Sequence, residues 1–166
     1  MLKKLFGSKT KKKVETIVAP LSGQVVPLED VPDDAFAQKL VGEGIAIVPE
    51  EGKVVSPING EVTMLFPTKH AVGLLSEQGL EILVHIGIET VAMGGEGFVA
   101  HVKAGDKVKV GDLLIEFSID LVKEKAKSTT SPIIITNFDR IDHLELATSE
   151  GVKMKESTLM KVDIKS

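Results

Sequence analysis

Short apolar runs follow one another from Ile17 almost to the end of the chain, and Gly, Pro, Asn or Asp breaks each run after a few residues. Val, Ile and Leu fill most of them, as in Ile45–Val48 and Ile133–Ile135. This pattern predicts an all-β fold, an antiparallel β-sandwich or barrel. Early acidic residues and a late lysine predict two short helical turns, over residues 30–39 and 120–127.

An internal repeat gives the predicted β-fold a duplicated design. Ala19–Val25 and Ser56–Val62 match in residue type at every position, 37 residues apart. In each copy, Pro suits a strand edge and Gly suits a turn. Ser131–Ile133 resembles a fragment of a third copy.

Composition excludes several classes of protein. With 166 residues, 43% of them hydrophobic, and a formal net charge of −4, the chain fits one ordinary globular domain, and no nucleic-acid partner is expected. The absence of cysteine excludes disulfides, thiolate metal sites and thiol nucleophiles. No apolar stretch approaches the roughly 20 residues of a membrane span. Because the first residues lack a signal-peptide pattern, we predict a cytoplasmic location.

The N-terminal residues differ from the rest. We expect a basic, flexible tail over residues 1–16 and a single domain over residues 17–166. If these residues formed a short helix, Leu2, Leu5 and Phe6 would share one face of it, with lysines on either side. Two hypotheses stay open for this tail: a disordered solubilising segment, and weak peripheral contact with the inner face of the plasma membrane.

Two histidines flank a predicted turn. If Ser76–Gly79 closes an antiparallel hairpin, the numbers of paired residues add up to 155, which places His70 opposite His85. Directly opposed residues have Cβ atoms roughly 4.5 to 5.5 Å apart, close enough for two imidazoles to hold one small group between them. The prediction depends on register, because a slip by one residue would turn one ring to the other face.

Strand alternation supports an accessible site around this pair. Leu80 and every second residue to Ile88 fall on one face, and His85 falls on the less apolar face. Gly87 lies beside His85 on that face, where we expect it to leave open space, and Thr68 shares the face of His70.

The sequence lacks the motifs that two other classes of protein require. A zinc-binding β-barrel hydrolase would need a His-x-His pair, which the sequence lacks, although adventitious zinc between His70 and His85 stays open. The Gly-Asp turns within Val102–Leu114 resemble those of biotinyl and lipoyl carrier domains, but the cofactor-bearing lysine motif is missing. A non-catalytic regulatory binding module is a further alternative.

The segment Gly79–Val91 carries a specific resemblance. It is similar to the phosphorylation-site signature of glucose-type enzyme IIA components of the bacterial sugar phosphotransferase system. Similarity continues through Ile17–Gly23, Val41–Ile47, Thr68–Ala71 and later segments, and thus covers nearly the whole chain. The family fold is an antiparallel β-sandwich or barrel, in agreement with the strand pattern.

The resemblance implies a chemistry. The phosphocarrier HPr would give a phosphoryl group to His85 as tele-phosphohistidine, and His85 would pass it to a cysteine of an enzyme IIB domain, with no cofactor required. Imidazole suits this task because its neutral nitrogen is nucleophilic at cytoplasmic pH and leaves readily afterwards. His70 would stabilise the phosphoryl group by donating an N–H. Thr68 would orient His70, or is a plain β-former, and Gly87 would make room for the phosphoryl group.

HPr and IIB must dock around this pocket, so we expect exposed apolar residues with a few charges there. The apolar candidates are Ala35, Phe36, Leu40, Val41, Phe66 and Leu83. Asp33 and Glu89 are available for arginines of HPr. Phe36 and Phe66 are equally well explained as core residues.

Overall fold

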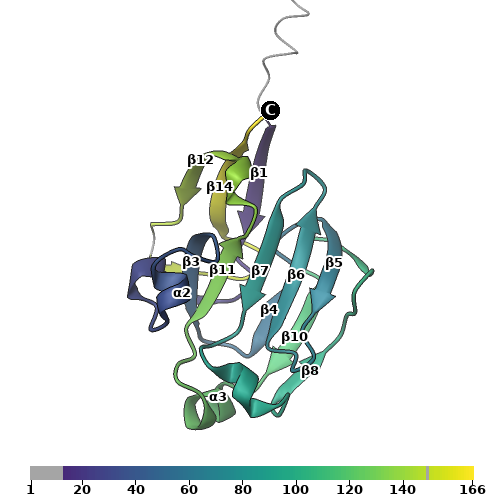
Figure 1. Cartoon of the computed structure of the whole chain (residues 1–166). Coiled ribbons are helices and arrows are strands. Elements are labelled where there is room, and N and C mark those ends of the chain that lie inside the picture. Colours follow the sequence, from purple (N-terminus) through teal and green to yellow (C-terminus); the bar gives the residue numbers. More distant parts are fainter. Residues whose placement is uncertain (1–12, 149) are drawn as a thin grey trace, which may run out of the picture.

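The computed structural model describes residues 13–148 and 150–166, and most of its regular structure is β-strand (Figure 1). The strands are β1 (Lys13–Val18), β2 (Gly23–Pro27), β3 (Glu43–Pro49), β4 (Lys53–Val55), β5 (Gly60–Leu65), β6 (Ala71–Ser76), β7 (Glu81–His85), β8 (Phe98–Ala100), β9 (Lys107–Val108), β10 (Leu113–Phe117), β11 (Ser131–Ile135), β12 (Ile141–Leu146), β13 (Gly151–Val152) and β14 (Thr158–Ile164). The helical elements are η1 (Leu28–Asp30), α2 (Asp34–Ala37), η2 (Thr90–Met93), α3 (Ile119–Lys125) and η3 (Phe138–Arg140). The predicted all-β class with short helical turns is confirmed.

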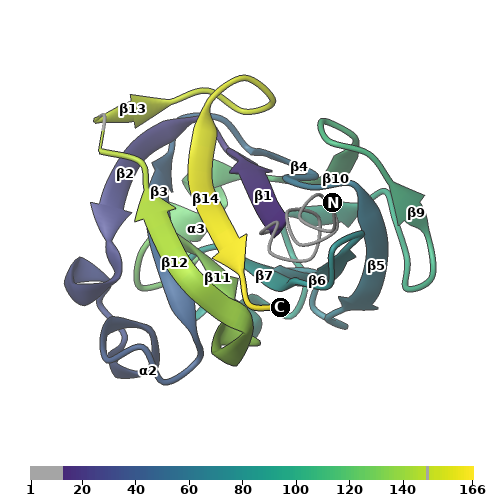
Figure 2. The same cartoon turned by 90° about the horizontal axis from the view of Figure 1, so that it is seen from above.

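In the part of the chain that the structure describes, three sheets with antiparallel pairing make up the scaffold. The largest has the strand order β13-β2-β3-β11-β7-β6-β5-β9, and two three-stranded sheets have the orders β1-β14-β12 and β4-β10-β8. In the view from above, β14 runs between β12 and β1 across the end of the molecule (Figure 2). Apolar residues of all three sheets form the main core, among them Ile17, Ile82, Val84 and Leu114, and each is at most 1% exposed.

A second, smaller core lies on the other face of the large sheet. Phe36 of α2 packs there with Ala46, Ile88 and Ile134, and Leu28 joins them from η1. Asp33 caps α2 by accepting hydrogen bonds from the backbone N–H groups of Ala35 and Phe36. This capped turn thus covers part of the sheet next to the end of β7.

The two copies of the sequence repeat lie at the starts of two equivalent strands. Gly23 begins β2 against β3, and Gly60 begins β5 against β6. A Cβ atom on Gly23 would lie 1.9 Å from the carbonyl oxygen of Val48, and one on Gly60 would lie 2.0 Å from that of Leu75. Both copies therefore need glycine because a neighbouring strand approaches closely.

The N-terminal boundary differs from the prediction. β1 begins at Lys13, four residues before the expected start of the domain, and pairs with β14 from Lys13↔Ile164 onward. Glu15 is 8% exposed and accepts a hydrogen bond of 2.6 Å from the Ser76 hydroxyl. Because of this sheet pairing and this buried contact, residues 13–16 belong to the folded domain. Leu2, Leu5 and Phe6, the residues behind the membrane hypothesis, lie outside the described residues.

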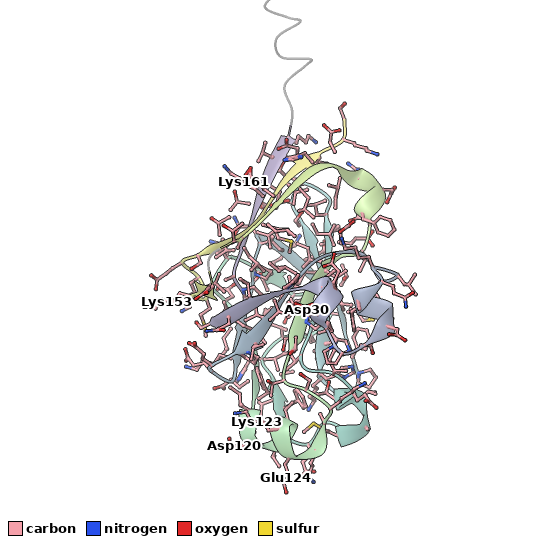
Figure 3. All side chains as sticks on the ribbon, turned by 90° about the vertical axis from the view of Figure 1, so that its left-hand side faces the viewer. Asp30, Asp120, Lys123, Glu124, Lys153 and Lys161 are labelled. Atoms are coloured by element: carbon pink, nitrogen blue, oxygen red, sulfur yellow. The ribbon has the colours of Figure 1, made fainter. Side chains whose placement is uncertain are left out.

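The helix α3 is amphipathic. Its Val122 is fully buried, whereas Asp120, Lys123 and Glu124 point outward at one end of the molecule (Figure 3). Among the described residues, no helix is long and apolar enough to cross a membrane.

Candidate functional site: a pair of facing imidazoles

His85 is the last residue of β7 and has one ring nitrogen in use. Its Nδ1 lies 2.8 Å from the carbonyl oxygen of Gly87, and since a carbonyl only accepts, Nδ1 carries the hydrogen. The Phe36 ring packs beside the imidazole with a centroid distance of 5.1 Å. In the neutral ring, Nε2 therefore keeps its lone pair.

His70 also lies at this site, but the strand register that brings it there differs from the predicted one. The hairpin pairs Ala71 with His85, so the register is shifted by one from the prediction, because Ser76 donates its N–H to the Leu80 carbonyl and the turn uses three residues, 77–79. His70 lies in a bend just before β6, after Lys69 at φ 59°, and its carbonyl accepts from the Ile86 N–H at 2.7 Å. Outside the strand, the alternation rule no longer directs its side chain.

The two imidazoles nevertheless meet. Their ring centroids are 4.9 Å apart at an interplanar angle of 79°, and Phe66 packs edge-on against His70 at 5.4 Å. The expected hydrogen bond from Thr68 is present, with Oγ1 2.6 Å from His70 Nδ1. If the hydroxyl donates, His70 carries its proton on Nε2, which is then a donor for a group held between the rings.

Both rings favour the neutral form. Burial, and secondly the nearby His85, lower the pKa of His70 from 6.5 to about 4. Burial also lowers the pKa of His85, while the Gly87 carbonyl and the Asp33 charge oppose this shift. Near neutral pH the pair thus offers an unprotonated nitrogen on His85 and little positive charge.

This burial predicts a pH-dependent stability. Below pH 6.5 the unfolded chain takes up a proton at residue 70, whereas folded His70 stays neutral down to about pH 4. The free energy of unfolding should therefore fall as the pH drops through this window, by up to about 1.4 kcal/mol per pH unit from this one site. Urea unfolding of wild type and His70→Gln between pH 4 and 7 measures it. Equal slopes in the two proteins would contradict the prediction, and His143→Gln, on exposed β12, is the control.

The open space that we expected above Gly87 is absent. Gly87 is buried, and a Cβ atom there would lie 2.7 Å from Thr90 Cγ2 and 2.9 Å from the Ser128 carbonyl oxygen. Its backbone has φ +68°, which directs the chain out of β7 and brings its carbonyl to His85 Nδ1. Glycine is needed here for its backbone, not to leave room for a ligand.

Gly87→Ala should therefore destabilise the protein markedly. The left-handed conformation costs roughly 1 to 2 kcal/mol for alanine, and the overlap with Thr90 and Ser128 adds to it. Gly94→Ala is a matched control, because Gly94 has φ +62° but nothing within 4 Å of an added Cβ. Urea unfolding should show a clearly larger loss for Gly87→Ala, and equal losses would show that the packing around Gly87 is not limiting.

The predicted docking residues differ in their exposure. Phe36 is 7% exposed and belongs to the second core, whereas Leu40 is 70% exposed. Val41, Phe66 and Leu83 are half-buried. Among the polar and small candidates, Glu89 is exposed, and Asp33 and Ala35 are half-buried, with one oxygen of Asp33 engaged as the α2 cap.

The other histidines take no part in this pair. His101 is exposed and contacts Glu116, with Nε2 2.8 Å from Oε1, and His143 is exposed on β12. Within residues 13–148 and 150–166, no three His, Asp or Glu side chains form a group that could hold a metal ion. Zinc between His70 and His85 thus finds no third protein ligand there.

Sequence reasoning missed the residues behind His85. Ser131 and Thr90, both fully buried, bond the backbone on either side of Gly87. In the sequence they are ordinary hydroxyl residues, and only the three-dimensional contact sets them apart.

Comparison with known proteins agrees with this geometry. Residues 15–141 match the family model for the phosphoenolpyruvate-dependent sugar phosphotransferase system, EIIA 1. A PTS system glucose-specific EIIA component of Bacillus cereus is 51% identical over 165 residues, covering 99% of this chain and 100% of the relative. One of Halalkalibacterium halodurans is 50% identical over 171 residues, covering 99% of each. Glucose permease IIA from Mycoplasma capricolum has a TM-score of 0.84 at 35% identity, covering 89% of this chain and 96% of that one.

The fold and these matches define the class of protein as a phosphotransferase component. The chain belongs to the EIIA type 1 family of the phosphoenolpyruvate-dependent sugar phosphotransferase system. It is a phosphoryl carrier of that system, and the zinc hydrolase and the regulatory binding module are not favoured.

Proposed function

We propose that Nε2 of His85 accepts a phosphoryl group from phosphorylated HPr and passes it to a cysteine of an enzyme IIB domain. The observation that carries this proposal is the hydrogen bond from His85 Nδ1–H to the Gly87 carbonyl. It leaves the Nε2 lone pair of His85 available beside His70. Nε2 attacks phosphorus, the Nε2–P bond forms, and the N–P bond of the donor phosphohistidine breaks. In the second transfer the cysteine thiolate attacks phosphorus, the S–P bond forms, the Nε2–P bond breaks, and His85 returns to its neutral Nδ1–H form.

The hydrogen bond to Gly87 gains strength during the reaction. When Nε2 bonds to phosphorus, the His85 ring still carries Nδ1–H and becomes positively charged. The Nδ1–H···O=C contact then becomes charge-assisted, and such bonds are roughly twice as strong as neutral ones. No proton has to leave His85 in either transfer.

His70 stabilises the transferring group. With its proton on Nε2, it donates to a phosphoryl oxygen while Thr68 holds its Nδ1. Its low pKa keeps it neutral, so it does not repel the cationic phosphohistidine. The Phe36 and Phe66 rings limit the freedom of the two imidazoles.

The partners dock on the surface around this pair. Exposed Leu40 and half-buried Val41, Phe66 and Leu83 provide apolar contact, and Asp33 and Glu89 provide negative charge for a basic partner. The names of the relatives support glucose as the sugar. A cytoplasmic location fits HPr as the donor and the IIB domain as the acceptor. The chain acts as one functional domain.

Incubation with phosphoenolpyruvate, enzyme I and HPr tests the proposal. Intact mass should show one added phosphoryl group, which is acid-labile and alkali-stable as expected of phosphohistidine. Addition of a IIB domain should remove it. A protein that gains no phosphoryl group from active phosphorylated HPr would refute the proposal.

A further inference from the structure

Every backbone polar group next to Gly87 has a partner. In the peptide before Gly87, the Ile86 carbonyl accepts from Thr90 Oγ1 at 2.6 Å, and the Gly87 N–H donates to Ser131 Oγ at 3.0 Å. In the peptide after it, the Ile88 N–H donates to the Ser128 carbonyl at 2.9 Å, and the Gly87 carbonyl accepts from His85. Two peptide planes are thus fixed on either side of a residue at φ +68°.

The peptide plane before Gly87 is fixed by hydrogen bonds to side chains alone. Ser131 begins β11 with 0% exposure, and its hydroxyl hydrogen goes to the Thr129 carbonyl at 2.8 Å. Its oxygen is therefore oriented to accept from the Gly87 N–H. Thr90 is also 0% exposed and donates its hydroxyl to Ile86. These two hydroxyl groups tie the end of β7 to β11 and η2.

We propose that Ser131 and Thr90 are positioning residues that set the orientation of the Gly87 carbonyl and thereby keep neutral His85 in its Nδ1–H form. The inference rests on the proposed role of His85 as phosphoryl acceptor. Loss of the hydroxyl at either position lets the peptide before Gly87 rotate, which weakens the carbonyl contact with Nδ1. Part of His85 then carries its proton on Nε2, and that fraction has no lone pair for phosphorus.

Nitrogen NMR of the unphosphorylated protein tests this directly. In ¹⁵N-labelled wild type, His85 should show a protonated Nδ1 and an unprotonated Nε2. Ser131→Ala should show a clear shift of both signals toward the opposite tautomer. The rate constant for uptake of phosphoryl from phosphorylated HPr should fall on the order of tenfold with KM for HPr unchanged, as expected for a misplaced reacting group. Ser131→Thr, which keeps a hydroxyl, should restore both readouts.

A matched control separates positioning from stability. Ser56 is also 0% exposed and bonds the local backbone, but it lies between β4 and β5, on other elements than His85. Ser56→Ala should lower stability without moving the His85 signals. If Ser131→Ala fails to fold, Thr90→Val and Thr90→Ser make the same comparison, because valine keeps the shape and serine keeps the hydroxyl.

The outcomes are distinguishable. Unchanged His85 signals and an unchanged rate constant in Ser131→Ala and Thr90→Val would overturn the inference. A tautomer shift in these variants, together with a wild type that accepts no phosphoryl group, would support the positioning role and refute the proposed function.

Discussion

His85→Ala should take up no phosphoryl group from phosphorylated HPr. The alanine side chain has no nucleophile, and His70 cannot replace His85 because its Nδ1 is bonded to Thr68 and its other nitrogen serves as a donor. The expected loss is complete within detection, at least a thousandfold in rate, since nucleophilic catalysis depends on this one atom. Intact mass after incubation with phosphoenolpyruvate, enzyme I and HPr measures it.

His101→Ala is the control for this experiment. His101 is exposed and contacts Glu116 on the β8–β10 side of the molecule. It should accept phosphoryl at the wild-type rate. If His85→Ala were still phosphorylated on a histidine while His101→Ala were not, the assignment of the acceptor would be wrong.

His70→Gln should separate the retention of phosphoryl from its transfer. His85 keeps its free Nε2, so phosphoryl still accumulates when excess phosphoenolpyruvate drives the reaction. Transfer to the IIB cysteine should slow by about 10²- to 10³-fold, the range expected when a hydrogen-bond donor to developing charge is lost or misplaced. Rapid-quench kinetics with purified IIB measures the rate constant.

Thr68→Val refines the test of His70. It keeps the ring but removes the hydroxyl 2.6 Å from Nδ1, so transfer should slow in the same direction by a smaller factor. A His70→Gln protein that passes phosphoryl to IIB at the wild-type rate would exclude the stabilising role of His70.

The β-class of the fold could be predicted because local patterns set it. Short apolar runs and turn residues indicate strands wherever they occur. The repeated Pro and Gly positions indicated a duplicated β-structure. The start of β1 was missed because Val14 and Glu15 gain their place from pairing with β14 and from Ser76, contacts that no local pattern contains.

The histidine pair was predicted for a reason that is only partly right. Strand alternation placed His85 on the accessible face correctly. The expected ladder register was off by one, yet the bend at His70 returns its ring to the site. The open space assigned to Gly87 was wrong because Thr90, Ser128 and Val122 fill it. Sequence periodicity describes strands well, but functional residues here lie where strands end.

The ring position of the phosphoryl group tests the central claim most directly. Phosphorylated ¹⁵N-labelled protein should show phosphorus bonded to Nε2 of His85, with Nδ1 still protonated and hydrogen-bonded. Long-range ¹H–¹⁵N spectra, with the ³¹P coupling to the ring nitrogen, locate the bond. Phosphorus on Nδ1 of His85, or on His70, would contradict the account, because the Gly87 carbonyl would then not determine which nitrogen reacts.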